Sequence, residues 1–458
     1  MTFDTRFDAE LIRRYDRQGP RYTSYPTAAQ FQPFDAQSYR TAALLSNSQQ
    51  TPLSIYVHVP FCASPCFYCG CNRVITRNPL KAQRYVAALC HEIELQAALF
   101  GAHRPVRQLH FGGGTPTFLT LAQLEQVLGR LRQAFALVAA DDREYSIEID
   151  PRTVDAAMIE GLARLGFNRL SLGIQDFDPA VQAAVNRIQP LEDTRSVVAH
   201  ARQHGIREIS FDLIYGLPRQ TTTGFARTLD EVVALRPTRI ATYGYAHLPA
   251  LFKAQRQIDP AELPAPAQRL ALLELTVQRL QAAGYVHIGM DHFALPDDGL
   301  TQAMQAGTLQ RNFQGYSSHA QCDLIGLGVS AIGTIGDCHT QNARDLAEYH
   351  ACLERHQLPI RKGIRLNSDD RVRRDVIQQI MCGGQLDFGR IEQDHCIDFR
   401  SYFSDELKRL APMHADGLLM QCAHGVAVTP AGRLLLRNIA MVFDAYLKAQ
   451  AAGFSRAI

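Results

Sequence analysis

The sequence predicts an α/β fold: a complete or partial β/α barrel followed by a smaller, mainly helical domain. Short β-branched apolar runs alternate with longer helical periods from about residue 53 to residue 290. This alternation indicates a parallel sheet with right-handed crossovers. Polar or glycine-rich residues follow nearly every predicted strand, as they do where a barrel builds its active site. An open doubly wound sheet would concentrate such residues near one switch point instead, so the barrel is favoured.

Six strand–helix units make up this region. The predicted strands are LSIYVHV (53–59), RQLHF (107–111), YSIEI (145–149), RLSLGI (169–174), EISFDLI (208–214) and RIATYGY (239–245). Helical periods between them include 81–99, 121–135 and 194–205. A later helical stretch, 267–284, leads into YVHIGMDHFA (285–294) as a further unit of the same kind.

Three parts of the chain are predicted. Residues 1–50 form an N-terminal strap or lid, with a helical piece DAELIRRYDRQ (8–18) before GPRYTSYPTA (19–28). Residues 51–365 form the catalytic domain, in which 295–360 supply loops and short strands. Residues 366–458 form the mainly helical C-terminal domain, and 458 residues are enough for two hydrophobic cores.

Composition excludes several classes of protein. The formal net charge of +2 argues against a nucleic-acid or anionic-membrane partner. Apolar runs fall short of the roughly 20 residues of a membrane helix, and the charged N-terminus lacks the apolar core of a signal peptide. We therefore expect a cytoplasmic protein, in which eleven cysteines are not a disulfide framework.

One short stretch, VPFCASPCFYCGC (59–71), holds Cys62, Cys66, Cys69 and Cys71. The first three would share one face of a helix, but Pro65 in a helix interior would cost about 3 kcal/mol. A loop at the end of the first strand is the better interpretation. Structural zinc sites usually use two separated cysteine pairs, and this chain has no second C-x2-C pair. A zinc site here would need scattered residues such as Cys322 or His58 as its remaining ligands. The C-x3-C-x2-C spacing suits a cubane iron–sulfur cluster with one iron left open.

This spacing resembles that of the radical S-adenosylmethionine (SAM) superfamily. The resemblance implies a partial (β/α)6 TIM-like barrel in which Cys62, Cys66 and Cys69 ligate a [4Fe–4S] cluster. The open iron would be chelated by the amine and carboxylate of SAM, whose reductive cleavage gives a 5′-deoxyadenosyl radical. Tyr68, directly before the third cysteine, is typical of the family. Cys71 is not expected to be a ligand, because a fourth thiolate would close the open iron.

A glycine-rich segment, HFGGGTP (110–116), follows the second strand and would let the backbone approach a ligand closely. Read alone, it also fits an ordinary strand-to-helix turn. Polar residues end the later strands, and Asp212 lies within an apolar run where an unpartnered carboxylate would be costly. By resemblance, the SAM contacts are Tyr56, Tyr68, Gly113, Gly114, Thr115, Glu148, Gln175, Arg187, Asp212, Ala246 and Ile332. Ile332 belongs to GLGVSAIG (326–333), which matches a dinucleotide fingerprint but lacks its strand–turn–helix context.

A closer resemblance runs along the whole chain, to the oxygen-independent coproporphyrinogen III oxidases of haem biosynthesis. It rests on GPRYTSYPTA, YVHVPFCxxxCxxCGCN, HFGGGTPT, GFNRLSLGIQDF, DLIYGLP, YAHLP, IGMDHFA, RNFQGY and DLIGLGVSAI. It implies oxidative decarboxylation of two propionates of coproporphyrinogen III to vinyls, with one SAM consumed at each. It further implies a small electron-transfer protein as reductant, and we take a monomer as the default. Arg21, Tyr245, His247, Arg311 and Phe313 are candidate substrate contacts.

Three alternatives remain at this point. A haem-binding chaperone of the same family keeps the cysteine loop but generally lacks the C-x-C ending and the 19–28 strap, so Cys71 and that strap argue against it. A haem-degrading or methylating relative would share the barrel without the whole run of motifs. A structural zinc protein would bind one zinc ion and leave SAM intact.

Overall fold

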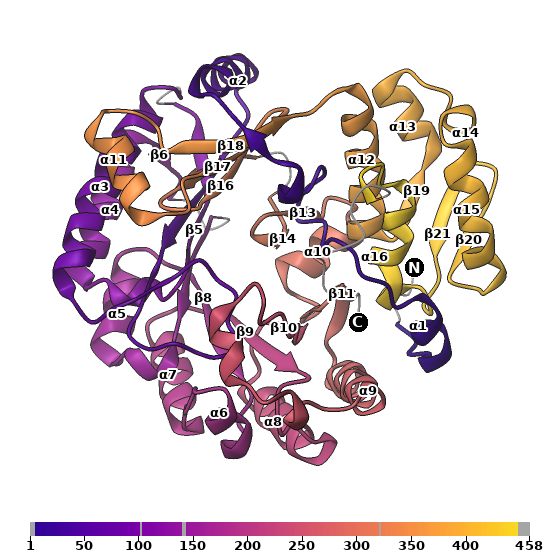
Figure 1. Cartoon of the computed structure of the whole chain (residues 1–458), viewed down its shortest axis with the longest axis horizontal. Coiled ribbons are helices and arrows are strands. Elements are labelled where there is room, and N and C mark those ends of the chain that lie inside the picture. The colour runs from indigo at the N-terminus through magenta and orange to yellow at the C-terminus, as the bar shows by residue number, and fades with distance from the viewer. Residues whose placement is uncertain (1–4, 101–102, 140–142, 320–321, 448–458) are drawn as a thin grey trace.

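The computed structural model describes residues 5–100, 103–139, 143–319 and 322–447. A large α/β lobe, on the left of Figure 1, adjoins a smaller lobe built from the C-terminal residues on the right. None of the helices in these ranges is long and apolar enough to cross a membrane.

Six parallel strands form the centre of the large sheet, side by side in chain order. They are β2 (Leu53–Val59), β5 (Pro105–Gly113), β7 (Glu144–Ile149), β8 (Arg169–Gln175), β9 (Glu208–Tyr215) and β10 (Arg239–Gly244). The short β6 (Ala136–Leu137) pairs with β5. Each predicted strand is present, with ends that differ by at most two residues.

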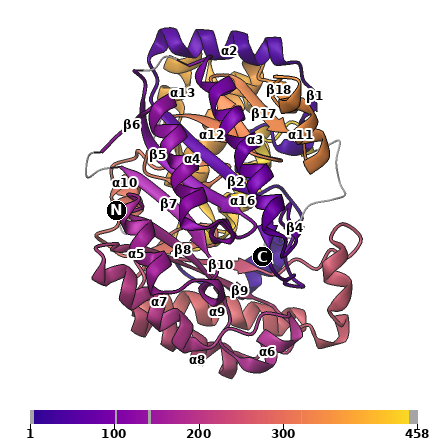
Figure 2. The same cartoon turned by 90° about the vertical axis from the view of Figure 1, so that its left-hand side faces the viewer.

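Helices connect these strands and cover the outer face of the sheet (Figure 2). They are α3 (Pro79–Ala97), α4 (Leu121–Ala134), α5 (Ala156–Arg164), α6 (Pro179–Ala184), α7 (Leu191–Gln203) and α8 (Thr222–Leu235). Thr120 begins α4 with a capping box, in which its side chain accepts from Gln123 N–H and the Gln123 side chain accepts from Thr120 N–H.

Alternation along each strand separates the core from the site. In β9, Ile209, Phe211 and Leu213 are buried against the helices, whereas Ser210 and Asp212 face the concave side. Because side chains alternate across a strand, one face packs apolar groups while the other presents polar groups to the barrel interior.

The sheet is open, as the partial-barrel prediction requires, and extends beyond the six strands at both edges. Next to β2 lies β15 (Asp323–Leu327), a seventh parallel strand that comes from the segment predicted to hold only loops and short strands. It is followed by β16 (Ile332–Ile335), β17 (Cys338–Asn342) and β18 (Ile360–Arg365), all antiparallel, with α11 (Leu346–Glu354) before β18. The helix α10 (Gly299–Gln305) and the hairpin β13 (Gln310–Asn312) and β14 (Gly315–Ser317) precede β15.

One predicted unit differs from the structure. Helix α9 (Pro266–Ala282) forms as expected, but YVHIGMDHFA is a hairpin of β11 (Val286–Gly289) and β12 (His292–Ala294). β12 pairs antiparallel with β10, so the segment is not a further parallel strand. Met290, with a φ of +51°, turns the chain back on itself.

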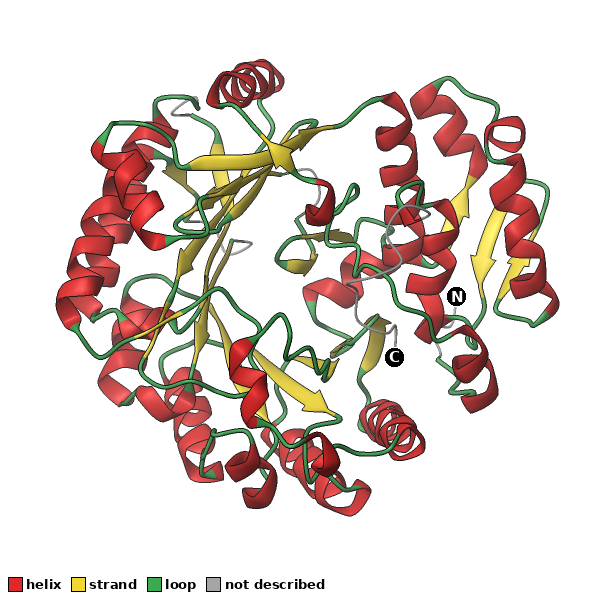
Figure 3. Cartoon of the chain, viewed as in Figure 1, coloured by secondary structure: helices red, strands yellow, loops and turns green. Residues whose placement is uncertain are grey.

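The smaller lobe is mainly helical, with one small antiparallel sheet that the sequence did not predict (Figure 3). Its helices are α12 (Ser368–Gly383), α13 (Phe388–His395), α14 (Phe399–Tyr402), α15 (Ser404–Ala415) and α16 (Leu436–Ala440). The sheet has β21 (Gly425–Val428) between β19 (Gln385–Asp387) and β20 (Leu419–Gln421). Its core includes Phe399 stacked on Phe388 at 4.1 Å between ring centroids.

The N-terminal segment joins the two lobes. Helix α1 (Ala9–Tyr15) lies beside the small lobe, and α2 (Ala36–Gln49) lies on the large lobe (Figure 1), with β1 (Gln32–Pro33) paired to β18. Between the helices, Tyr22 donates to the Asp444 carboxylate (2.9 Å), Arg437 donates to the Pro20 carbonyl (2.9 Å) and Arg311 to the Arg21 carbonyl (3.2 Å). The strap is therefore fixed to residues of both lobes.

Candidate active site

A cavity of about 610 Å³ lies at the carboxyl ends of the central parallel strands. It brings together most of the residues predicted from the sequence. Its lining includes Cys62, Cys66, Tyr68, Cys69, Cys71, Gly113, Gly114, Thr115, Glu148, Gln175, Arg187 and Asp212.

The cysteine segment is a loop, as Pro65 predicts. It leaves β2 through β3 (Phe61–Cys62) and returns through β4 (Val74–Ile75), which pairs with β3 in parallel. Inside the loop, Cys69 N–H donates to the Cys66 carbonyl (3.3 Å), and so does the Arg73 guanidinium (3.0 Å). The three spaced thiols therefore lie on one short loop that its own hydrogen bonds stabilise.

Cations and hydrogen-bond donors surround these thiols. Arg187 Nη1 lies 3.6 Å and Arg152 Nη2 3.7 Å from Cys66 Sγ, and the Thr115 hydroxyl lies 3.6 Å from Cys62 Sγ. A hydrogen bond from Cys71 lowers the pKa of Cys69 to about 6, whereas burial raises the pKa of Cys62 to about 11. The lining thus favours the anionic form of Cys69 and places two guanidinium groups beside Cys66.

The spacing of the thiols bears on what they bind. In the described part of the chain, no three His, Cys, Asp or Glu side chains converge closely enough for a single metal ion. The cysteines are all unpaired, and four of them, Cys62, Cys66, Cys69 and Cys71, line the cavity from one loop. A cubane is a larger body whose irons take thiolates at separate corners, and this lining fits it.

Glu148 links the glycine-rich segment to the strands. Its carboxylate accepts from Gly113 N–H (2.9 Å) and lies 3.3 Å from His110 Nε2. Gly113 has a φ of +117°, which favours glycine, and a Cβ on Gly112 would lie 2.8 Å from a Glu148 oxygen and displace that carboxylate. Burial raises the pKa of Glu148, but His110 and the Gly113 N–H outweigh it, leaving the pKa below its usual value. Glu148 is thus a charged group fixed against the loop.

Asp212 is the second carboxylate of the cavity and differs in its environment. It accepts a hydrogen bond from the Ser171 hydroxyl (3.2 Å). Burial, with the negative charge of Glu148, raises the pKa of Asp212 to about 7. One carboxylate of the pair is therefore ionised at neutral pH and the other is close to its titration point.

A buried network of two arginines and Asp150 closes the side of the cavity. Asp150 accepts from Arg152 at 2.6 and 2.9 Å and from Arg187 at 3.2 and 3.3 Å. Arg187 also donates to the Gly173 carbonyl (2.6 Å), which fixes the end of β8. The sequence analysis identified Arg187 by resemblance only and missed Arg152. The one sequence signal for Arg152 was its position directly after Asp150 and Pro151, at the end of a predicted strand.

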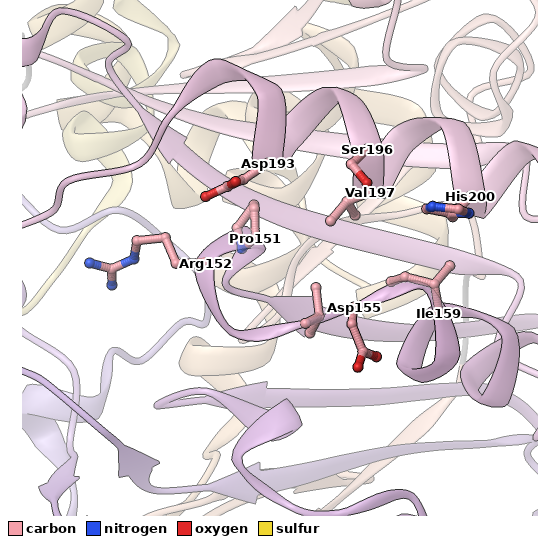
Figure 4. Close-up of a pocket in the computed structure, with 9 residues that line it drawn as sticks. Pro151, Arg152, Asp155, Ile159, Asp193, Ser196, Val197 and His200 are labelled. Atoms are coloured by element: carbon pink, nitrogen blue, oxygen red, sulfur yellow. The ribbon is translucent and has the colours of Figure 1, made fainter.

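Arg152 also lines a smaller cavity of about 150 Å³ between η3 (Pro151–Thr153) and α7. Figure 4 shows that its side chain points away from those of Asp155 and His200. Its guanidinium therefore serves the cysteine side and not this smaller cavity.

Three predicted residues do not line the main cavity. Tyr56 is on β2, where its ring stacks on His110 (5.8 Å) and its hydroxyl hydrogen-bonds His58 (3.0 Å). The Ala246 carbonyl accepts from Gln255 (3.2 Å), and Ile332 begins β16 on the other side of β15. Tyr243, absent from the prediction, does line the cavity, from the end of β10.

The five candidate substrate contacts are not among the residues that line this cavity. Tyr245 and His247 hydrogen-bond each other (2.9 Å), and Phe313 packs edge-on against Phe31 and His339. Arg311 lies over the Tyr316 ring at 4.6 Å. Arg21 lies over the Tyr243 ring at 5.3 Å and forms an ion pair with Asp291.

Comparisons with known proteins show which family the chain belongs to. Residues 56–232 match the radical SAM superfamily, and residues 366–435 match the HemN C-terminal domain. The chain is 53% identical over 446 residues to a protein of Pseudomonas aeruginosa, covering 96% of each, and 47% identical to one of Escherichia coli, covering 99% of this chain and 98% of the other. Both are named oxygen-independent coproporphyrinogen III oxidase. The chain belongs to the oxygen-independent coproporphyrinogen III oxidase family.

A solved structure agrees. Coproporphyrinogen III oxidase (HemN) from Escherichia coli, described as a radical SAM enzyme, superposes with a TM-score of 0.93 at 46% identity, covering 97% of this chain and all of that one. Membership in the oxygen-independent coproporphyrinogen III oxidase family supports the oxidase interpretation over the haem chaperone. Radical SAM membership likewise argues against a structural zinc protein.

Proposed function

We propose that the chain catalyses the oxygen-independent oxidative decarboxylation of two propionate side chains of coproporphyrinogen III, which gives protoporphyrinogen IX. The observation that carries this proposal is one cavity in which the Cys62–Cys69 loop faces the polar ends of the parallel strands. The choice of coproporphyrinogen III as substrate is supported by similarity over the full length to enzymes named for it.

The cofactors follow from the same lining. Cys62, Cys66 and Cys69 would hold a [4Fe–4S] cluster, and Gly113, Gly114, Thr115 and Glu148 would hold SAM beside it. When bound, the two together supply a 5′-deoxyadenosyl radical that removes a hydrogen atom from the substrate. Two SAM molecules per substrate are proposed, because two propionates react.

The protein's own residues set the charge and the geometry. Arg187 and Arg152 lie against Cys66 and stabilise negative charge on the cysteine side, and Asp150 holds both guanidinium groups in place. Glu148, fixed by Gly113 and His110, presents a carboxylate to a cationic ligand. Tyr56, which hydrogen-bonds His58 and stacks on His110, remains a proposed catalytic residue and SAM contact. Gln175 and Tyr68 complete the lining, and Ala246 and Ile332 remain proposed SAM contacts.

The remaining organisation is proposed on the same basis. Residues 1–50 serve as strap, 51–365 as the catalytic domain and 366–458 as the C-terminal domain. We further propose a small electron-transfer protein as reductant, a monomeric state and a cytoplasmic location.

Anaerobic reconstitution tests the proposed function. Iron and sulfide are supplied, then reductant, SAM and coproporphyrinogen III, and 5′-deoxyadenosine and the divinyl product are measured together. We expect both products, with about one 5′-deoxyadenosine per vinyl group formed. SAM cleavage without vinyl product would refute the proposed substrate while sparing the chemistry of the cluster.

The raised pKa of Asp212 predicts a pH-dependent affinity for SAM. Loss of its proton near pH 7 adds a negative charge to the cavity, and SAM carries a net positive charge. Affinity should therefore rise with pH, by at most about tenfold per pH unit for one coupled proton, between pH 6 and pH 8. Equilibrium binding of SAM to the reconstituted, unreduced protein measures it.

The control variant is Asp212→Asn, which cannot ionise at this position. Its affinity for SAM should be nearly flat over the same range and should match the low-pH value of the unchanged protein. A slope in Asp212→Asn equal to that of the parent would assign the pH dependence to another group.

A further inference from the structure

The proposed substrate is too large and too highly charged to be held by the cavity at the cysteine loop alone. Coproporphyrinogen III is a tetrapyrrole macrocycle with four propionate carboxylates, and a ligand of this kind needs a largely apolar cavity with a few well-placed cations. The cluster and SAM must both fit in the 610 Å³ beside the cysteine loop, which leaves little room there. If the proposed function holds, on which this inference rests, the macrocycle needs a second cavity.

A second, larger cavity separates the N-terminal segment from α9. Its volume is about 980 Å³, within the range of cavities that hold cofactor-sized ligands. Helices α1 and α9 lie next to each other at the lower right of the molecule in Figure 1. Apolar walls come from Ile12, Pro266 and Leu270, and charged groups from Arg13, Asp16 and Arg269.

Arg269 connects this cavity to the ends of the strands. Its guanidinium lies over the Tyr215 ring at 5.7 Å from the centroid. A Cβ on Gly244 would lie 2.8 Å from Arg269 Nη2, so glycine at the end of β10 makes room for the guanidinium. The arginine therefore reaches from the wall of the second cavity to the residue that follows Tyr243.

The guanidinium of Arg269 keeps a free donor inside the protein. Its Nε is shielded from solvent and has no hydrogen-bond partner among the described residues. No ion pair in the described ranges involves Arg269, although the chain forms many ion pairs elsewhere. A shielded guanidinium donor without an acceptor costs free energy that an anionic ligand would recover.

More cations lie between the two cavities. Tyr243 lines the cysteine-side cavity, and Arg21 lies over its ring. Arg311, whose Nη1 is buried without a hydrogen-bond partner, donates through Nε to the Arg21 carbonyl. In the described chain Arg21 has Asp291 as its one carboxylate partner, and Arg311 has none. The local charge beside Tyr243 is therefore positive.

We propose that the cavity between α1 and α9 binds the macrocycle and that Arg269 binds a propionate carboxylate of it. Arginine suits this role, because its planar guanidinium pairs with a carboxylate through two parallel hydrogen bonds. A macrocycle held there has Tyr243 and Gly244 between it and the cysteine loop. The side chain that reacts passes this point to reach the first cavity.

Binding of coproporphyrinogen III to the reconstituted full chain tests the proposal, measured anaerobically by titration and by KM. In Arg269→Gln we expect the Kd and the KM for coproporphyrinogen III to rise about 10- to 100-fold, the range for a lost charge-assisted hydrogen bond. The Kd for SAM and reductant-driven SAM cleavage without substrate should stay within about twofold. Arg269→Lys should recover part of the affinity, because it keeps the charge but not the paired hydrogen bonds.

Two further variants complete the design. Arg279→Gln, on the same helix but exposed and paired with Asp230, is the matched control and should bind as the parent does. Ala267→Trp narrows the second cavity from an exposed position while leaving Arg269 in the sequence, and it should weaken substrate binding as strongly. Unchanged substrate binding in Arg269→Gln overturns the proposal. If Arg269→Gln does not fold, unchanged substrate binding in Ala267→Trp overturns it. A different result would refute the proposed function alone: the parent binds the substrate but forms no vinyl product, and these variants lose substrate binding.

Discussion

Replacing Cys66 by serine removes the visible iron–sulfur absorbance of the reconstituted protein and lowers SAM cleavage to background. Cys66 lies at the centre of the loop, with Arg187 at 3.6 Å and Arg152 at 3.7 Å from its sulfur. A serine hydroxyl stays protonated at neutral pH and is a poor ligand for iron, so one corner of the cluster loses its anchor. Iron content, the absorbance spectrum and 5′-deoxyadenosine yield measure the effect. We expect a loss of activity of at least about 10³-fold, since the cofactor itself is lost.

Cys71→Ser is the matched control, because Cys71 lies two residues beyond Cys69 in the same loop. Its backbone N–H donates to the Cys69 sulfur at 3.5 Å, and this bond survives the substitution. The cluster absorbance should therefore remain. Equal loss of the cluster in both variants would show that the assignment of three ligands is wrong.

Glu148→Gln weakens SAM binding by about 10- to 100-fold while the cluster absorbance stays. The carboxylate carries a full charge at neutral pH, because His110 and the Gly113 N–H hold its pKa below the usual value. Removing the charge removes an attraction to a cationic ligand, whereas the amide oxygen of glutamine still accepts from the Gly113 N–H. Equilibrium binding of SAM to the oxidised, reconstituted protein measures it.

Glu160→Gln serves as the control, since Glu160 is exposed on α5. It should bind SAM as the parent does. If Glu148→Gln also kept the parent's affinity, Glu148 would be a structural brace for the glycine-rich segment and not a cofactor contact.

The strands of the large lobe could be read from the sequence because their pattern is local. Ile209, Phe211 and Leu213 alternate with Ser210 and Asp212, and this period of two marks both the strand and its two faces. Pro65 likewise identified the cysteine segment as a loop, because a proline in a helix interior removes a backbone hydrogen bond and is costly. The same local signal misjudged YVHIGMDHFA, since a strand and a short hairpin share an apolar run and differ only in the turn at Met290.

Other features depended on contacts between distant parts of the chain. β15 lies beside β2, although some 260 residues separate them, and its apolar run DLIGL does not say which strand it joins. Asp150 bonds both Arg152 and Arg187, and Arg21 pairs with Asp291. The pairs of Asp150 with Arg187 and of Arg21 with Asp291 exist because the tertiary fold places segments that are distant in the chain side by side, which no spacing along the sequence records.

The sequence by itself determined the α/β class, the six parallel strands, the cysteine loop and the set of polar strand ends, because each depends on a periodicity or a spacing within a few residues. The tertiary structure alone decided how the sheet continues beyond the six strands, that Glu148 and Asp212 share one cavity with opposite pKa shifts, and that Arg269 reaches a second cavity without an acid partner among the described residues. Burial and charge act through space: the order of the strands and the placement of α1 across the second cavity from α9 set those distances, whereas the identity of the neighbours along the chain does not.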